Sequence, residues 1–268
     1  MPSKKALFIL LLTLIFTSYV SADAFLVDPL VVRAEPGKII DVGGVQPGEK
    51  MELIFSTDSG YGEEAKWIQA VFGNNPYGEI IQAKSSEVGT RSLITTISTS
   101  TLLPAGTYRF PLTLKGTPGI LEDETYQIQF VVAPQLFSAT LQNPKVEGKL
   151  NETITYDVTL VNDSSATVSV RVQPSLPPTW GSGTTITIKP HSFKSIPLLV
   201  TPRFAGPKSF DIQVTNEQTG QRYDSLHANL VAKASVKDHY SAGLYGFPFF
   251  TISLVANYLS NAFFSILL

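Results

Sequence analysis

Short runs in which apolar and polar residues alternate recur through the middle of this chain. The alternation has a period of two residues, which is the pattern of β-strands with one buried face. It occurs in residues 51–55, 108–114, 126–132, 154–160, 168–172, 196–200 and 210–214. Turn-forming pairs such as Pro47-Gly48 and Pro118-Gly119 separate these runs. No stretch between residues 25 and 235 has the 3.6-residue period of a helix, so we predict that this region is all-β.

The second half of this β-rich region repeats the first half, shifted by 100 residues. Residues 101–114 read TLLPAGTYRFPLTL and residues 201–214 read TPRFAGPKSFDIQV, so that Thr, Ala, Gly and Phe coincide. We interpret the shared register as a tandem duplication of an immunoglobulin-like (Ig-like) β-sandwich with about seven strands. The predicted sandwiches cover residues 23–133 and 134–233. Their bulkiest core candidates are Trp67 and Trp180.

The N-terminal end has the layout of a secretory signal peptide. Two lysines precede an apolar run, and the small residues Val20 and Ala22 occupy the −3 and −1 positions of a cleavage site. We therefore predict a signal peptide over residues 1–22, cleaved before Asp23. Cleavage two residues later, after Ala24, is a second option that the sequence leaves open.

The C-terminal end is predicted to span a membrane. Residues 244–268 carry no charge, and a helix of this length reaches about 37 Å, enough to cross a bilayer core of about 30 Å. We predict a single transmembrane helix there, after a linker over residues 234–243. A removable anchoring signal with Ala234-Ser235 as its small-residue site is the alternative. Four polar residues share one face of the predicted helix and form a predicted packing face toward another transmembrane helix: Ser253, Asn257, Ser260 and Asn261.

Composition excludes several classes of function. The chain has no cysteine, which rules out disulfides, thiol catalysis and iron–sulfur clusters. Without Lys4 and Lys5 of the leader, 18 basic residues face 22 acidic ones, so a nucleic-acid partner is not expected. The three histidines are too scattered for a metal site, and no motif of a catalytic centre is present. We therefore expect no enzymatic activity, no cofactor and no metal.

Two kinds of candidate site remain. Asn151 and Asn162 begin N-x-S/T triplets, which predict N-glycosylation in an exported protein. Tyr61 and Tyr77 stand in loops and are candidates for contact with a glycan or a partner protein. Two acidic clusters, around Asp58 and at residues 122–124, show no defensible ligand spacing for calcium, so we interpret them as solvated loops.

The second predicted sandwich resembles a known type of surface repeat. A strand ending in TYDVTLVN is followed by Pro177-Pro178-Thr179-Trp180, the strand TTITIKP and the hairpin sequence FAGPKSFDIQVTN. This order is similar to the Ig-like repeats of archaeal S-layer-related proteins and of bacterial NEW3-type domains. The resemblance covers residues 136–232, and more weakly 25–132, and implies an Ig-like fold at a cell surface. One departure is His191-Ser192, where those repeats usually carry a Pro-Gly turn.

Three functional hypotheses follow. The preferred one is a non-enzymatic, single-pass protein of the cell membrane. Its Ig-like domains lie outside the cytoplasm and make structural or adhesive contacts with envelope proteins or glycans. The alternative is an accessory subunit of a translocon- or glycosylation-associated complex that docks through its tail onto an integral membrane protein. The order of signal peptide, Ig-like part and C-terminal anchor predicted for this chain is similar to that of translocon-associated subunits. A third, an enzyme or its sugar-binding module, rests only on the aromatic loops.

Overall fold

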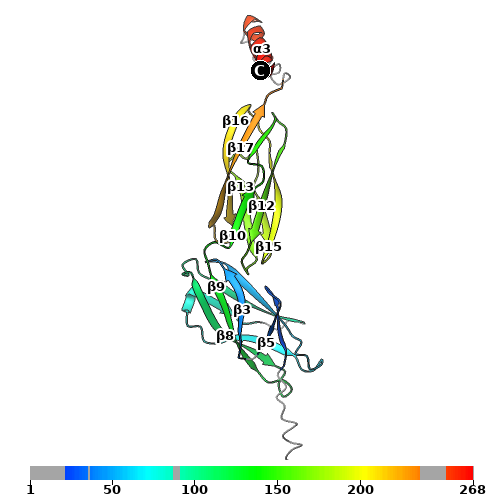
Figure 1. The fold of residues 1–268 in the computed structure, drawn as a ribbon, viewed down its shortest axis with the longest axis vertical. Coiled ribbons are helices and arrows are strands. Elements are labelled where there is room, and N and C mark those ends of the chain that lie inside the picture. Colours follow the sequence, from blue (N-terminus) through cyan, green and yellow to red (C-terminus); the bar gives the residue numbers. More distant parts are fainter. Residues whose placement is uncertain (1–21, 36, 87–90, 236–251, 268) are drawn as a thin grey trace, which may run out of the picture. The chain divides into compact units, whose positions relative to one another are not determined.

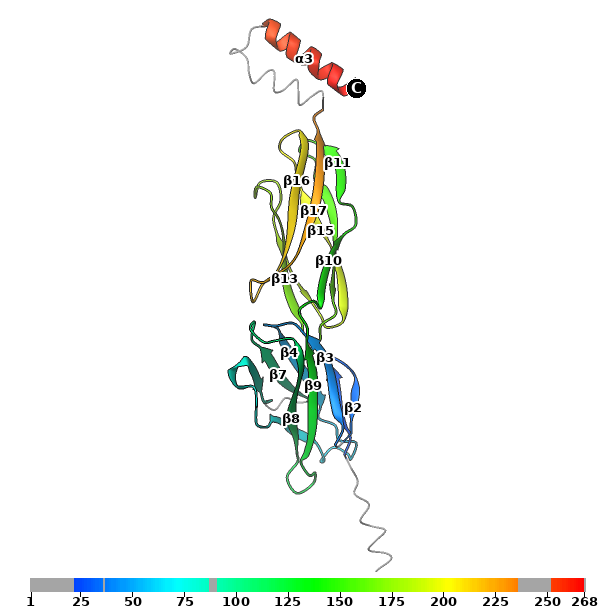
Figure 2. The same cartoon turned by 60° about the vertical axis from the view of Figure 1, so that its left-hand side comes forward.

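The computed structural model describes residues 22–35, 37–86, 91–235 and 252–267 (Figure 1). The chain divides into two compact units, 1–133 and 134–268. Almost all of the predicted signal peptide and most of the predicted linker lie outside the described residues. Figure 2 shows that strands dominate both units.

The first unit is a β-sandwich with nine strands in its described residues. One sheet has the strand order β2-β1-β4-β7-β6 and the other has the order β3-β9-β8-β5. A short 3-10 turn, η1 (Gly78–Ile80), precedes β6. The strands are β1 (Ala24–Asp28), β2 (Val32–Ala34), β3 (Ile39–Val45), β4 (Lys50–Ser56), β5 (Trp67–Phe72), β6 (Ile81–Lys84), β7 (Ser92–Thr99), β8 (Gly106–Gly116) and β9 (Glu124–Val132).

The strand order of the first unit is that of an immunoglobulin constant-type domain. Seven strands remain when β2 and β3 are left out. In chain order, the first, second, fifth and fourth of them form one sheet, which contains β1, β4, β7 and β6. The third, sixth and seventh form the other sheet, which contains β5, β8 and β9. Strand β3 runs parallel to the last strand, β9. At the start of β8, the sixth of these strands, the Tyr108 hydroxyl donates to the carbonyl oxygen of Pro104 at 2.8 Å. This is the tyrosine-corner contact of Ig sandwiches, and the predicted Ig-like fold is confirmed.

The second unit is also Ig-like, with one strand paired differently. Its sheets have the orders β10-β12-β15 and β11-β17-β16-β13-β14. The fourth Ig strand, β14, pairs with β13, whereas its counterpart β6 in the first unit pairs with β7. The strands are β10 (Phe137–Leu141), β11 (Lys145–Lys149), β12 (Ile154–Asn162), β13 (Val168–Pro174), β14 (Thr184–Ile188), β15 (Ser192–Val200), β16 (Gly206–Asn216) and β17 (Arg222–Lys233).

The period-two pattern places the apolar residues between the sheets. In β12 the even-numbered residues from Ile154 to Leu160 are buried, and the odd-numbered Thr155 and Asp157 are exposed. Both predicted core tryptophans are buried, with Trp67 1% and Trp180 5% exposed. The largest fully buried side chains are Trp67, Tyr126, Tyr156, Phe55, Phe110 and Phe130. Because no cysteine joins the sheets, this apolar layer is what holds them together.

Two strands in the late half of each unit start 100 residues apart. Strands β7 and β15 start at Ser92 and Ser192, and β8 and β16 start at Gly106 and Gly206. Side chains at equivalent positions, such as Phe110 and Phe210, are buried alike. These positions agree with the interpretation of a tandem duplication.

The C-terminal segment contains one described helix, α3 (Ile252–Leu267), of 16 residues. Within the described residues, no helix combines the length and the apolar character needed to cross a membrane. Residues 244–251 and 268 of the predicted span lie outside the described part. The transmembrane helix therefore stays a prediction.

Strand β15 has an open edge, because no strand pairs with its outer side in the described part of the second unit. An open edge presents unpaired backbone groups to which another chain can pair. Two residues of β15 oppose this. Pro197 has no N–H to donate, and Lys194 places an exposed charge in the row of the buried Ile196 and Leu198. Proline and charges directed toward the core are common protections of edge strands.

Replacing Lys194 with Val and Pro197 with Thr should allow the β15 edges of two molecules to pair. We expect the double variant to self-associate more strongly than the wild type, because both protections are lost while the core face is retained. Analytical ultracentrifugation over a concentration series measures this. The control is Arg171→Val on β13, a strand paired on both sides, which should leave association unchanged. Equal association of wild type and double variant would show that the edge is protected in another way.

Candidate functional site

The loop between β4 and β5, residues 57–66, has a shape that its sequence imposes. Gly60 and Gly62 have φ angles of +80° and +91°. Residues other than glycine rarely adopt this backbone conformation. The Asp58 carboxylate accepts a hydrogen bond from the backbone N–H of Gly60 at 2.9 Å. An isolated β-bridge between Asp58 and Lys66 closes the base of the loop. The loop is therefore an ordered turn with charged residues at its base.

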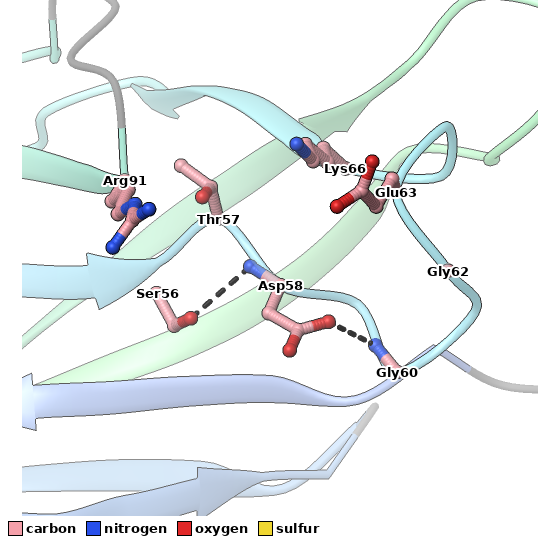
Figure 3. Close-up of a pocket in the computed structure, with 8 residues that line it drawn as sticks. All are labelled: Ser56, Thr57, Asp58, Gly60, Gly62, Glu63, Lys66 and Arg91. Carbon is pink, nitrogen blue, oxygen red and sulfur yellow. Dashed lines mark hydrogen bonds between the residues drawn. The ribbon is translucent and has the colours of Figure 1, made fainter.

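An open hollow of about 490 Å³ lies beside this loop (Figure 3). Its size falls within the range of small-molecule sites. The backbone N–H of Thr57 donates to the carbonyl oxygen of Arg91 at 3.4 Å, which brings the segment before β7 to the hollow. The residues that line it are Ser56, Thr57, Asp58, Gly60, Gly62, Glu63, Lys66 and Arg91.

Four charged side chains give the hollow both donors and acceptors. Asp58 and Glu63 supply carboxylates, and Lys66 and Arg91 supply cations; all four are exposed. Among the described residues, Glu63, Lys66 and Arg91 have no ion-pair partner. These groups can hydrogen-bond a ligand without first breaking a salt bridge of the protein. The hollow therefore suits a polar ligand with hydroxyl or carboxylate groups.

A second loop, residues 117–123, supports the first one. The Lys66 N–H donates to the Thr117 hydroxyl at 3.1 Å, and the Thr117 N–H donates to the Lys66 carbonyl oxygen at 3.0 Å. Lys115 and Asp123 form an ion pair at 2.5 Å across the ends of β8 and β9. The hydrogen bond from Lys115 lowers the pKa of the Asp123 carboxyl. The two loops thus form one hydrogen-bonded surface at the end of the unit where β9 begins.

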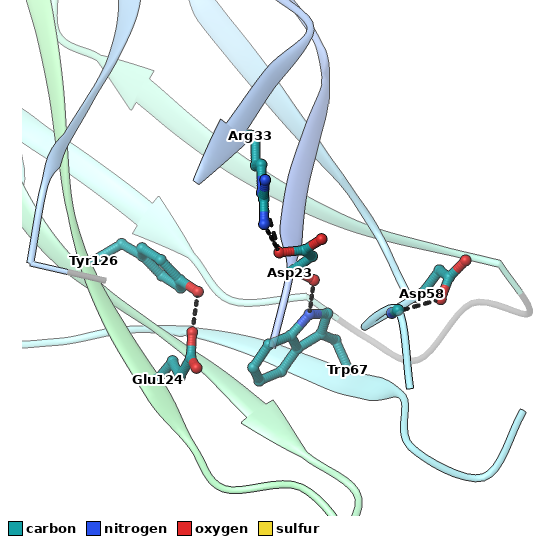
Figure 4. Close-up of polar contacts among 7 residues, drawn as sticks. Asp23, Arg33, Asp58, Trp67, Glu124 and Tyr126 are labelled. Carbon is teal, nitrogen blue, oxygen red and sulfur yellow. Dashed lines mark hydrogen bonds and ion pairs between the residues drawn. The ribbon is translucent and has the colours of Figure 1, made fainter. Parts of the chain in front are cut away.

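Asp23 fastens the start of β1 to the same end (Figure 4). Its backbone N–H donates to the Ser59 carbonyl oxygen at 3.0 Å, and its own carbonyl oxygen accepts from Trp67 Nε1 at 3.0 Å. Its carboxylate forms an ion pair with Arg33. Asp23 is therefore part of the fold, and it satisfies the indole N–H of a buried tryptophan.

Tyr126 lies in the same region as Asp23, on β9 (Figure 4). Its hydroxyl donates to the Glu124 carboxylate. Burial raises the pKa of Tyr126, and the hydrogen bond to Glu124 raises it further. The phenol stays protonated at neutral pH and acts as a hydrogen-bond donor within the wall of the sandwich.

The two predicted contact aromatics have different environments. Tyr61 is 46% exposed in the loop beside the hollow, so it stays a contact candidate. Tyr77 packs edge-to-face on Tyr108 and Phe110, with ring centroids 5.0 and 5.3 Å away. Its hydroxyl accepts from the Arg109 N–H at 3.4 Å. Tyr77 therefore stabilises the tyrosine corner and offers little free surface to a ligand.

The two predicted glycosylation sites also differ. Asn151 is exposed, and its Oδ1 accepts from Arg203 at 3.1 Å. Asn162 is 0% exposed, and its Nδ2 donates to the carbonyl oxygens of Ala166 and Lys189 at 2.8 and 3.0 Å. A glycan on Nδ2 of Asn162 is incompatible with these bonds and with its burial. Asn162 is therefore corrected from a modification site to a buried structural residue.

The residues of the predicted packing face belong to the second unit. Asn257, Ser260 and Asn261 are exposed on α3, and the side chain of Ser253 lies outside the described residues. In the described part of the chain, no three His, Asp or Glu side chains gather in a way that could hold a metal ion. The hollow itself was not predicted, because Arg91 is far from Asp58 and Lys66 in sequence. A hint was present in the Gly-rich loop, where acidic residues and Lys66 occur together.

Comparisons with known proteins identify no family. No protein-family model matches this chain, and no curated protein matches its sequence. Among solved structures, a chimeric titin Z1Z2 functionalized with a decorin peptide is 12% identical, with a TM-score of 0.38 over 81% of this chain and 100% of that one. Fibronectin(III)-like modules of Clostridium thermocellum CbhA are 11% identical, with a TM-score of 0.28 over 79% and 94%.

The D0-D1 domain of intimin is 12% identical to this chain, with a TM-score of 0.26 over 70% of this chain and 94% of that one. Likenesses at these scores carry no argument about function. The Ig-like assignment rests instead on the strand order and the tyrosine corner of this chain.

Removing the Asn162 side chain should destabilise the second unit. We expect Asn162→Ala to lower the free energy of unfolding by about 2–3 kcal/mol, because buried carbonyl groups lose their donors. Urea denaturation followed by circular dichroism measures this loss. The matched control is the exposed Asn74→Ala, for which we expect a change within about 0.5 kcal/mol. A wild-type midpoint for Asn162→Ala would contradict the structural role of this amide.

Proposed function

We propose that this chain is a non-enzymatic, membrane-anchored contact protein outside the cytoplasm, and that the loop end of its first unit binds a partner glycan or protein. One observation carries the proposal. Two loops joined by hydrogen bonds hold a hollow whose cations and carboxylates are exposed, and Glu63, Lys66 and Arg91 have no ion-pair partner among the described residues. In Ig sandwiches, the loops at the ends of the sheets are the common sites of recognition.

The setting of this proposal comes from the sequence. The leader with small residues before Asp23 supports export, and the uncharged apolar tail over residues 244–268 supports a single membrane span. The resemblance to S-layer-related and NEW3-type repeats supports a place at the cell surface. Both units contribute Ig-like sandwiches, a fold that serves many functions, so the function is argued from the hollow.

A sugar is the ligand class that the hollow fits best. Carboxylates such as Asp58 and Glu63 accept hydrogen bonds from sugar hydroxyls, and Lys66 and Arg91 donate to ring oxygens or to acidic substituents. Tyr61, exposed in the same loop, supplies an aromatic face on which a sugar ring can stack. Acceptors, donors and an aromatic ring within one loop support a polar, hydroxyl-rich partner.

A second candidate function is that of an accessory subunit in a membrane complex. It is supported by Asn257, Ser260 and Asn261, whose side chains are exposed on α3. Amide groups are unfavourable against lipid and favour contact with another helix. Changing Asn257 and Asn261 to Leu should then release any integral membrane partner that co-purifies in mild detergent. Unchanged co-purification would exclude docking through this face.

Reversing the charges of the hollow should abolish ligand binding. We expect Lys66→Glu with Arg91→Glu to lower binding to responsive glycans by about tenfold or more, because charge-assisted hydrogen bonds contribute about 1.5–3 kcal/mol each. The probe is an array of neutral and acidic glycans, read with the labelled full-length protein in detergent. Lys50→Glu, at the other end of β4, is the control and should bind as the wild type does. Binding that survives the double reversal would place recognition elsewhere, and an array without any signal would contradict a glycan partner.

The mature protein should begin at Asp23. Cleavage after Ala24 would remove Asp23 and leave the buried Trp67 indole N–H without its acceptor, at a cost of about 1–3 kcal/mol. Cleavage before Asp23 keeps this bond and the ion pair with Arg33. Mass spectrometry of the N-terminal peptide from native membranes measures the start. A first residue of Phe25 would contradict this reasoning, and a retained leader would contradict export.

A further inference from the structure

The end of the second unit from which the chain continues toward its tail is built from two interlocked loops. The carbonyl oxygen of Lys233, the last residue of β17, accepts from the Leu150 N–H at 3.0 Å. The Asn151 N–H donates to the Pro202 carbonyl oxygen at 2.9 Å, and Arg203 Nη1 donates to Asn151 Oδ1 at 3.1 Å. These bonds fix the turn over residues 201–205 against the turn over residues 150–153.

Phe204 is displayed on this fixed turn. Its side chain is 68% exposed, and its ring centroid lies 5.9 Å from that of the buried Trp180. Pro202, two residues earlier, is buried and holds the turn in place. The aligned position in the first unit is Pro104, so the sandwich itself does not require an aromatic residue here. The Phe204 ring is therefore held on a hydrogen-bonded turn and is available for contact at this end of the unit.

Basic and acidic residues lie together at this end of the second unit. Lys149, Arg203 and Lys233 lie on the same end, with the carboxylates of Glu147 and Glu152 among them. Lys233 pairs with Glu147 at 2.6 Å, and Glu152 accepts from the backbone N–H of Lys149. Lys149 and Arg203 thus supply two exposed basic side chains to the end of the unit that displays Phe204. Aromatic and basic side chains occur together on surfaces that rest on lipid headgroups.

We propose that this end of the second unit rests on the surface of an anionic lipid bilayer. Phe204 enters the headgroup boundary, and Arg203 and Lys149 face the lipid phosphates. The inference rests on the proposed membrane anchor, because the tail inserts into that same bilayer. Residues 234–243 span at most about 36 Å when extended. A tether this short keeps the surface near the membrane at a high effective concentration, so a weak contact is enough.

The predicted glycan on Asn151 competes with this contact. The Asn151 side chain touches Arg203, so a bulky sugar there would hold the loop away from the lipid. The two features exclude each other on one molecule. The intact mass of the protein from native membranes, before and after removal of N-glycans, decides between them. An unmodified Asn151 is expected, and full occupancy of Asn151 would overturn the lipid contact.

The test uses the absence of natural cysteine. Ala205→Cys in the full-length protein, labelled with an environment-sensitive fluorophore, is reconstituted into vesicles of phosphatidylcholine with or without phosphatidylserine. We expect a blue shift in emission relative to detergent, larger with phosphatidylserine. Gln218→Cys, in the turn between β16 and β17 at the other end of the unit, is the matched label and should not shift. Adding Phe204→Ser should abolish the shift at position 205, whereas Phe204→Leu should retain most of it.

The outcomes separate the anchor from the surface. Protein that does not float with the vesicles would overturn the proposed anchor and, with it, this inference. Protein that floats but shows no shift at position 205, or a shift that survives Phe204→Ser, would overturn the lipid contact and leave the anchor standing. Equal shifts with and without phosphatidylserine would remove the role of Arg203 and Lys149. Circular dichroism of each variant shows that its sandwich is folded.

Discussion

Each unit depends on one apolar layer between two sheets, because the chain has no cysteine to join them. Burial of side chains such as Trp67 and Tyr156 supplies most of the favourable free energy of folding. The polar groups of large aromatic residues must then find partners inside the sandwich. Trp67 finds the carbonyl oxygen of Asp23, and Tyr156 donates to that of Asn229 at 2.9 Å. The first bond fixes the chain at the start of β1, and the second joins β12 to β17 of the facing sheet.

The period-two pattern predicted the strands well, because alternation is a local property and burial follows it directly. The pairing of the fourth strand was beyond such reasoning. Strands β6 and β14 join different sheets, and the choice depends on neighbours distant in sequence. The triplet at Asn162 shows a related difficulty. The same residues that form a glycosylation signal here build a buried hydrogen-bonded turn, and only the fold distinguishes the two.

His191 stands in a turn where a glycine would be the usual sequence signal, and tertiary contacts hold the turn instead. It has a φ of 48°, the left-handed conformation that a glycine would usually adopt in such a turn. Its backbone N–H donates to the Ser164 carbonyl oxygen at 3.2 Å, and its Nε2 lies 3.1 Å from the Ser165 hydroxyl. The contacts of His191 with Ser164 and Ser165, which follow Asn162, thus stabilise this turn. The hollow of the first unit escaped prediction for a similar reason, since Arg91 reaches it only through the pairing of β4 with β7.

The parallel pairing of β11 with β17 has a mechanical consequence. Five residues of each strand lie side by side, from Lys145 opposite Asn229 to Lys149 opposite Lys233. The chain enters the unit before β10 and leaves it after β17. A pulling force between these points drags β11 and β17 in opposite directions along their length. It loads the ladder in shear, so its bonds must break together instead of opening one after another. A ladder loaded this way resists tension applied between the two ends of the unit.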